Sequence, residues 1–91
     1  GVRRSSSAAG LDATVTGPDR IDVGAAGTFT AEVTGARSVQ WIGPDGSVTD
    51  GGEPLTVRAS RPGAGSVSLL ATSIETGEAV VIEASFEAVE P

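Results

Sequence analysis

The sequence predicts an all-β protein, a two-layer sandwich of about seven antiparallel strands. From Leu11 onward, apolar residues recur at every second position, which is the period of a strand with one buried face. Turn-forming clusters of Gly, Pro and Asp interrupt this pattern about every eight to twelve residues, and no segment carries a sustained stripe of helical period. The 91 residues are expected to form one domain with a single core.

The chain divides into a lead segment and a domain. Residues 1–10, G-V-R-R-S-S-S-A-A-G, show no periodicity and have the composition of a flexible linker. Residues 11–91 are expected to form the sandwich. Its first strand is expected over residues 11–16, L-D-A-T-V-T, and ends at a Gly-Pro pair, after which a short strand follows over residues 20–23.

The middle of the domain supplies the most regular strand and the tryptophan. Residues 27–35, G-T-F-T-A-E-V-T-G, alternate almost without fault, as expected for a half-buried antiparallel strand. The next strand, residues 38–41, directs Trp41 toward the core. Pro44 and Asp45 then take the central positions of a β-turn.

Three further strands complete the pattern. They are expected over residues 54–60, 66–74 and 77–89, with Thr76 and Gly77 in a short hairpin turn between the last two. Hydrophobic residues make up 38% of the chain, but most are Ala and Val, so the three aromatic rings are expected to be the bulky groups of the core. These core aromatics are Phe29, Trp41 and Phe86.

Two motifs carry a resemblance to a known family. The sequence W-I-G-P-D-G at residues 41–46 is similar to the W-D-F-G-D-G that PKD domains, a subtype of bacterial immunoglobulin-like domain, commonly carry at the end of their third strand. Residues 62–63, P-G, precede the alternating run S-V-S-L at 66–69, which resembles the family's next motif. The resemblance covers residues 11–90 and implies an immunoglobulin-like β-sandwich in which Trp41 fills the space between the sheets.

The chain departs from the PKD-like pattern at three places. Ile42 stands where the family has an Asp, Gly43 and Pro44 replace Phe-Gly, and Gly65 stands where an aromatic residue is usual. The first change removes a carboxylate that would otherwise follow the tryptophan directly.

The composition excludes most catalytic chemistry. The chain has no His, Cys or Lys, so it lacks the usual zinc ligands, a thiolate nucleophile and an imidazole base. We therefore expect a protein that is not an enzyme and that has no catalytic residue and no cofactor. The net charge is −6, and residues 62–91 carry five Glu with no basic residue, which disfavours nucleic acid as a partner. No apolar run approaches the roughly 20 residues of a membrane span, so no membrane insertion by this segment is expected.

Three acidic residues fall within one Gly-rich stretch. Asp45, Asp50 and Glu53 offer carboxylates for calcium, to which neighbouring backbone carbonyls would add. The D-x-D-x-D-G spacing of a dedicated calcium loop is absent, however. Acidic residues in turns commonly form the turn itself, so we expect no metal site.

One set of apolar residues has the opposite parity to the core. If the strands pair in the immunoglobulin order, four side chains stand together on the outer face of one sheet, as a possible interaction face. Alternatively, a bend or bulge at S-L-L-A, residues 68–71, turns some of them into the ends of the sandwich. The four residues are Ile42, Leu70, Ile74 and Val81.

These observations favour a binding or spacer module. The resemblance implies a non-catalytic, extracytoplasmic, monomeric domain of a larger bacterial surface, membrane-anchored or secreted protein, with neighbouring domains or another protein as partner. One alternative is an accessory domain that binds carbohydrate or a cell-wall polymer, with Trp41 as a stacking platform. Another is the ectodomain of a membrane sensor kinase.

Overall fold

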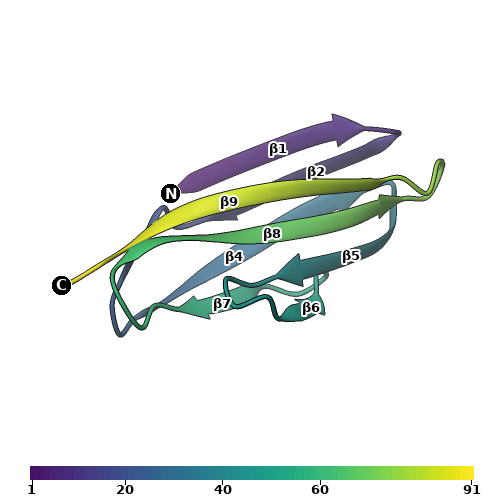
Figure 1. Cartoon of the computed structure of the whole chain (residues 1–91). Helices are drawn as coiled ribbons and strands as arrows, with labels where there is room; N and C mark the ends of the chain where they lie inside the picture. The colour runs from purple at the N-terminus through teal and green to yellow at the C-terminus, as the bar shows by residue number, and fades with distance from the viewer.

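Two β-sheets stack face to face in the computed structural model, which describes residues 1–91 (Figure 1). One sheet has the order β1-β2-β4-β7 and the other β3-β9-β8-β5-β6. Neighbouring strands are antiparallel throughout, except that β3 runs parallel to β9. The strands are β1 (Val2–Ala8), β2 (Leu11–Gly17), β3 (Arg20–Asp22), β4 (Ala26–Thr34), β5 (Ala36–Ile42), β6 (Val48–Asp50), β7 (Leu55–Arg58), β8 (Gly63–Ser73) and β9 (Ala79–Val89).

The structure confirms the all-β sandwich that the alternating pattern predicts. Along β2, β8 and β9, buried residues alternate with residues that are exposed or only partly buried, because successive side chains of a strand point to opposite faces. Trp41 and Phe29 are fully buried, and Phe86 is buried beside them. The buried apolar core consists of Leu11, Ala13, Val15, Ile21, Phe29, Trp41, Val57, Ala59, Val67, Leu69, Ala71, Ile82, Ala84, Phe86 and Ala88.

The turn expected at Pro44 and Asp45 is present. The N–H of Gly46 donates to the carbonyl of Gly43 at 3.0 Å, which closes a four-residue turn around the two predicted central residues. Gly46 has a φ of +85°, a conformation that glycine adopts without steric cost. The hairpin turn at Thr76 and Gly77 also lies where the sequence predicts it, between β8 and β9.

The first ten residues differ from the flexible linker that their composition predicts. Val2–Ala8 form β1, which pairs with β2 along its whole length. Ala9 and Gly10 connect the two strands with φ angles of +54° and +77°, as in a two-residue hairpin turn of type I′. The linker expectation for 1–10 is therefore corrected. Most side chains of this edge strand are exposed and polar, so the strand depends on backbone bonds and leaves no periodic hydrophobic signal.

β1 also lies alongside β9, although the two strands share no ladder (Figure 1). β3 pairs only with the last part of β9, residues 87–89, so the rest of that edge of β9 has no strand partner. Val2 packs against the core at this side of the sandwich. The added strand thus covers a side of the molecule where β9 would otherwise be open.

A single hydroxyl joins the turns at one end of the sandwich. Ser73, at the end of β8, is fully buried, and its Oγ donates to the carbonyl of Ala9 at 2.7 Å. The same oxygen accepts bonds from the backbone N–H groups of Glu75 and Thr76, at 3.1 and 3.3 Å. Removing it would leave buried polar groups without partners, which typically costs about 1–3 kcal/mol each.

The two phenylalanines form the opposite part of the core, and each covers a glycine. Their ring centroids lie 6.0 Å apart at an interplanar angle of 48°. Phe86 on β9 faces Gly65 on β8, and a Cβ added to Gly65 would lie 2.5 Å from the Cζ of Phe86. Phe29 covers Gly17 in the same way. The aromatic residue that position 65 lacks is thus replaced in space by a ring on the adjacent strand.

We predict that Gly65→Ala destabilises the domain by about 1–3 kcal/mol, because the new methyl group overlaps the Phe86 ring. Chemical denaturation followed by circular dichroism measures the change. Ala64→Ser, on the exposed face of the same strand, is the matched control and should change the stability by less than about 0.5 kcal/mol. The cost of Gly65→Ala should shrink in a Phe86→Leu background, and an equal cost in both backgrounds would contradict the overlap.

Candidate functional site

The structure brings three of the four predicted face residues together on the outer surface of the five-stranded sheet. Leu70 on β8 lies directly opposite Val81 on β9, and Ile42 on β5 lies in the next row. Val48 on β6 lies opposite Ile42 and joins them. We name Ile42, Val48, Leu70 and Val81 the outer-face patch. Two neighbouring rows cross the sheet in the strand order β9, β8, β5, β6. The first row is Val81, Leu70, Gln40 and Asp50, and the second is Glu83, Ser68, Ile42 and Val48.

The exposure of these side chains fits a surface that is open to a partner. Val48 and Val81 are 58% and 61% exposed, while Ile42 and Leu70 are half-buried. β8 and β9 pair from Gly63 to Thr72 without a register shift, so no bulge between them turns Leu70 into the core. The patch therefore lies on a regular, continuous part of the sheet.

Ile74 lies apart from the outer-face patch. It follows the end of β8, in the turn toward β9, and is 64% exposed. Four residues of strand span about 13 Å, and the paired residues Thr72 and Ala79 stand between Ile74 and Leu70. Its backbone N–H donates to the carbonyl of Gly35 at 2.9 Å, which attaches the turn to the loop before β5.

Sequence reasoning missed Val48 because its segment carries no alternation. All three residues of β6 are exposed, and the strand is only three residues long. Its place beside Ile42 follows from the pairing of β6 with β5, a tertiary contact that closes after the turn at residues 43–46. The turn at G-P-D-G was the available signal, since a tight turn returns the chain antiparallel to the strand before it.

Acidic groups border the outer-face patch. Glu83 lies opposite Ser68 in one row, and Asp50 lies opposite Gln40 in the other. Both side chains are exposed. The arrangement suits a partner surface with an apolar centre and basic residues around it.

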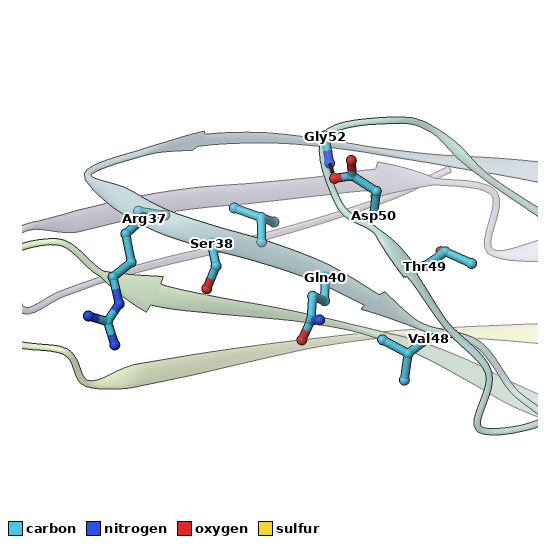
Figure 2. Close-up of a pocket in the computed structure, with 9 residues that line it drawn as sticks. Arg37, Ser38, Gln40, Val48, Thr49, Asp50 and Gly52 are labelled. Atoms are coloured by element: carbon cyan, nitrogen blue, oxygen red, sulfur yellow. Dashed lines mark hydrogen bonds between the residues drawn. The ribbon is translucent and has the colours of Figure 1, made fainter.

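An open depression of about 630 Å³ adjoins the outer-face patch at Val48 (Figure 2). The first half of β5 forms one side, with Arg37 and Ser38, and β6 forms the other, with Asp50. Its charged and polar side chains are exposed, and Arg37 and Asp50 have opposite signs. Figure 2 shows Asp50 turned toward the backbone of Gly52, so this carboxylate serves the turn.

The acidic residues of the Gly-rich stretch stabilise turns. Asp45 Oδ1 accepts bonds from the N–H and the hydroxyl of Ser47, at 3.0 and 2.7 Å. Asp50 Oδ1 accepts a bond from the N–H of Gly52 at 2.8 Å. Glu53 contributes its backbone carbonyl, which accepts a 2.7 Å bond from Nε1–H of Trp41. No three acidic side chains gather into a group that could hold a metal ion.

Trp41 has no exposed surface from which to stack on a ligand. Its ring is fully buried, and its one polar atom is bonded to the Glu53 carbonyl. Phe29 and Phe86 are buried as well, so none of the three aromatic rings forms a platform on the surface.

Comparisons with known proteins add no family to this description. No protein-family model matches the chain, and a search of the curated proteins finds no match. None of the elements is a helix long and apolar enough to span a membrane.

We predict that the pKa of Asp45 lies below its ordinary value of 3.8, chiefly because the Ser47 hydroxyl bonds to the carboxylate. A lowered pKa in the folded state means that Asp45 stabilises the fold at pH values above its unfolded pKa. This contribution is lost as the pH falls through the folded pKa. Ser47→Ala should raise the pKa of Asp45 in an NMR titration, and Ser60→Ala should not. An unchanged pKa in Ser47→Ala would contradict this assignment.

We also predict that Trp41 emits as a buried indole. Its fluorescence should be shifted to the blue of N-acetyl-tryptophanamide in water, and acrylamide should quench it only weakly, because both sheets enclose the ring. Unfolding in guanidinium should abolish both properties. Emission at the wavelength of the free indole in native buffer would place the ring outside the core.

Proposed function

We propose that the chain is a non-catalytic, immunoglobulin-like module of the PKD-like subtype. In this proposal it belongs to a larger bacterial protein exposed outside the cytoplasm, and it binds a neighbouring domain or another protein through the outer-face patch. The observation that carries the proposal is the contiguous apolar group of Ile42, Val48, Leu70 and Val81 on a regular sheet.

The strand order supports the immunoglobulin-like part of the proposal. β2, β4 and β7 are neighbours in one sheet, as strands A, B and E are in immunoglobulin sandwiches. β5, β8 and β9 are neighbours in the other, as strands C, F and G are, and β6 takes the position beside C. The buried tryptophan lies on the strand that corresponds to C, which is where immunoglobulin domains carry theirs.

The apolar character of the patch supports binding over passive spacing. A sheet face that served only solubility would carry charged and hydroxyl side chains, as the outer face of the other sheet does with Thr14, Thr16, Thr30 and Glu32. The outer-face patch instead places four aliphatic side chains in adjacent rows. A partner that covers them removes apolar surface from water, which favours binding. The acidic border then selects partners that carry basic residues around an apolar centre.

The positions of the two chain ends favour a projecting module over an in-line spacer. Both ends lie at the same end of the sandwich (Figure 1), whose longest dimension is 45 Å. Asp19 links the start of the chain to the last part of β9, because its carboxylate is 3.8 Å from the Gly1 amine and its carbonyl accepts a bond from the N–H of Glu87. A domain attached at one end extends away from its parent chain, which leaves its sheet faces accessible.

The same placement of the ends also favours a second candidate, the ectodomain of a membrane sensor kinase. Segments that flank such an ectodomain enter the membrane on one side, so they require both ends of the domain to face that side. β1 is the element that creates this arrangement, because it returns the chain start to the end where β9 finishes.

We predict that Val81→Arg weakens binding of the flanking domains of the parent protein about tenfold or more, because it places a charge within the patch, directly opposite Leu70. Titration of the isotope-labelled domain, followed by NMR, measures both the affinity and the location of the shifts. Ile74→Arg is the matched control, since Ile74 is equally exposed but lies outside the patch. Shifts confined to the other sheet, or equal effects of the two variants, would refute the proposed docking face.

A further inference from the structure

We propose that the free edge of β1 pairs with β1 of a second copy of this chain, antiparallel and with Ser5 opposite Ser5. The pairing would join the two β1-containing sheets into one continuous sheet about a two-fold axis. This inference concerns the backbone of one sheet edge, so it is independent of the outer-face patch on the other sheet. It also departs from the monomeric state expected from the sequence.

β1 presents a regular set of unpaired backbone groups. Its ladder with β2 is continuous from Val2 to Ala8 and contains neither a bulge nor a proline. In a two-residue hairpin the closing pair, here Ala8 and Leu11, exchanges both backbone bonds, and bonded residues alternate from there. The N–H and C=O groups of Arg3, Ser5 and Ser7 therefore point away from β2, and they have no backbone partner within the chain.

The other sheet edges are poorer templates. β3 and β6 are three residues long and β7 is four, whereas β1 has seven residues in register. The part of β9 that β3 leaves unpaired, residues 79–86, lies alongside β1 of the same chain. Short edge strands are a usual protection against pairing with other chains. β1 contains neither proline nor a bulge, two of the devices that protect long edges, and residues 5–7 are three consecutive serines. Arg4, opposite Val15, is the one charged residue on its inward-facing side.

Backbone bonding and charge select one register. Pairing centred on Ser5 lets all three outward residues bond, with Ser5 opposite Ser5 and Arg3 opposite Ser7 in both directions, for six backbone bonds in total. Pairing centred on Arg3 or Arg4 places two arginines directly opposite each other and allows fewer bonds. Pairing centred on Ser6 or Ser7 also allows fewer bonds.

Side chains in the Ser5 register are complementary. Ser7 donates its hydroxyl proton to the carboxylate of Asp12, which lies opposite it on β2. Arg3 of the second copy, opposite Ser7, would therefore lie in the same row as the Asp12 carboxylate. The central row would contain four hydroxyls, since Ser5 and Thr14 already bond at 3.0 Å in each copy. β1 carries two arginines and no acid in a molecule of net charge −6, so repulsion between copies is weaker here than at the acidic surfaces.

The dimer is expected to be weak. One pair of seven-residue edges buries less than the roughly 1,200 Å² that stable, specific interfaces begin to require. Association should therefore be detected at high protein concentration, or where a parent assembly brings two copies close together.

Cysteine cross-linking tests the register directly, because the chain contains no cysteine of its own. In the proposed pair the Ser5 Cα atoms lie about 5.5 Å apart, a separation that a disulfide accepts. Under oxidised glutathione, Ser5→Cys should form covalent dimers about tenfold faster than Arg3→Cys or Ser7→Cys alone, whose Cα atoms would be some 13 Å apart. A mixture of Arg3→Cys and Ser7→Cys should yield the mixed dimer. Equal rates for all single variants would overturn the proposal.

Sedimentation provides the second measurement. Ser5→Pro removes only an outward N–H and places the ring on the free edge, so it should abolish concentration-dependent association of the otherwise unmodified chain. Protected amides in β2 and β4 should show that the fold is retained. If the unmodified chain sediments as a monomer up to about 1 mM, or if Ser5→Pro associates equally well, the proposed pairing is wrong.

Discussion

The hydrogen bond between Trp41 and the carbonyl of Glu53 is the contact on which the arrangement of the two sheets depends. Trp41 lies on β5 in one sheet, and Glu53 lies in the segment that carries the chain from β6 across to β7 in the other sheet. The indole N–H is buried, so leaving it unpaired would cost about 1–3 kcal/mol. One bond therefore positions both the largest core side chain and the connection between the layers. Gly51 makes the approach possible, because its N–H donates to Val39 at 2.9 Å where a Cβ would meet the backbone of β5.

Most of the remaining core side chains are small, so the three aromatic rings must fill much of the space between the sheets. Ala and Val make up most of the buried set, so neither sheet can fill the space between them with branched chains alone. The two phenylalanines occupy one part of this space, each over a glycine of a neighbouring strand. At the other end, a buried serine hydroxyl takes the place of apolar packing and connects the β1–β2 turn to the β8–β9 turn. The domain has no disulfide. It is stabilised by buried apolar area, by rings packed over glycines that lack a Cβ, and by the hydrogen bonds of one buried hydroxyl.

The two proposed interaction surfaces lie on different sheets and would bind through different interactions. The outer-face patch would bind through aliphatic side chains with an acidic border, so its specificity depends on residue identity. The β1 edge would bind through backbone groups, so its specificity depends on register and on which positions are free of proline and charge. The outer-face patch lies on the sheet opposite to β1, whereas the β1 edge begins one residue after the start of the chain.

Residue alternation alone determined the sandwich, seven of the eight strands from Leu11 onward and the burial of Phe29, Trp41 and Phe86, because alternate burial is a property of each strand by itself. Alternation also gave Ile42, Leu70 and Val81 the parity opposite to the core residues of their own strands, and the immunoglobulin strand order then placed them on one outer face. Tertiary structure decided the rest. β1 is held by backbone bonds to a neighbour, and its polar side chains carry no sign of that pairing. Val48 joined the patch, and Ile74 left it, through strand pairing and strand length, which are set by contacts between segments and not by the local pattern.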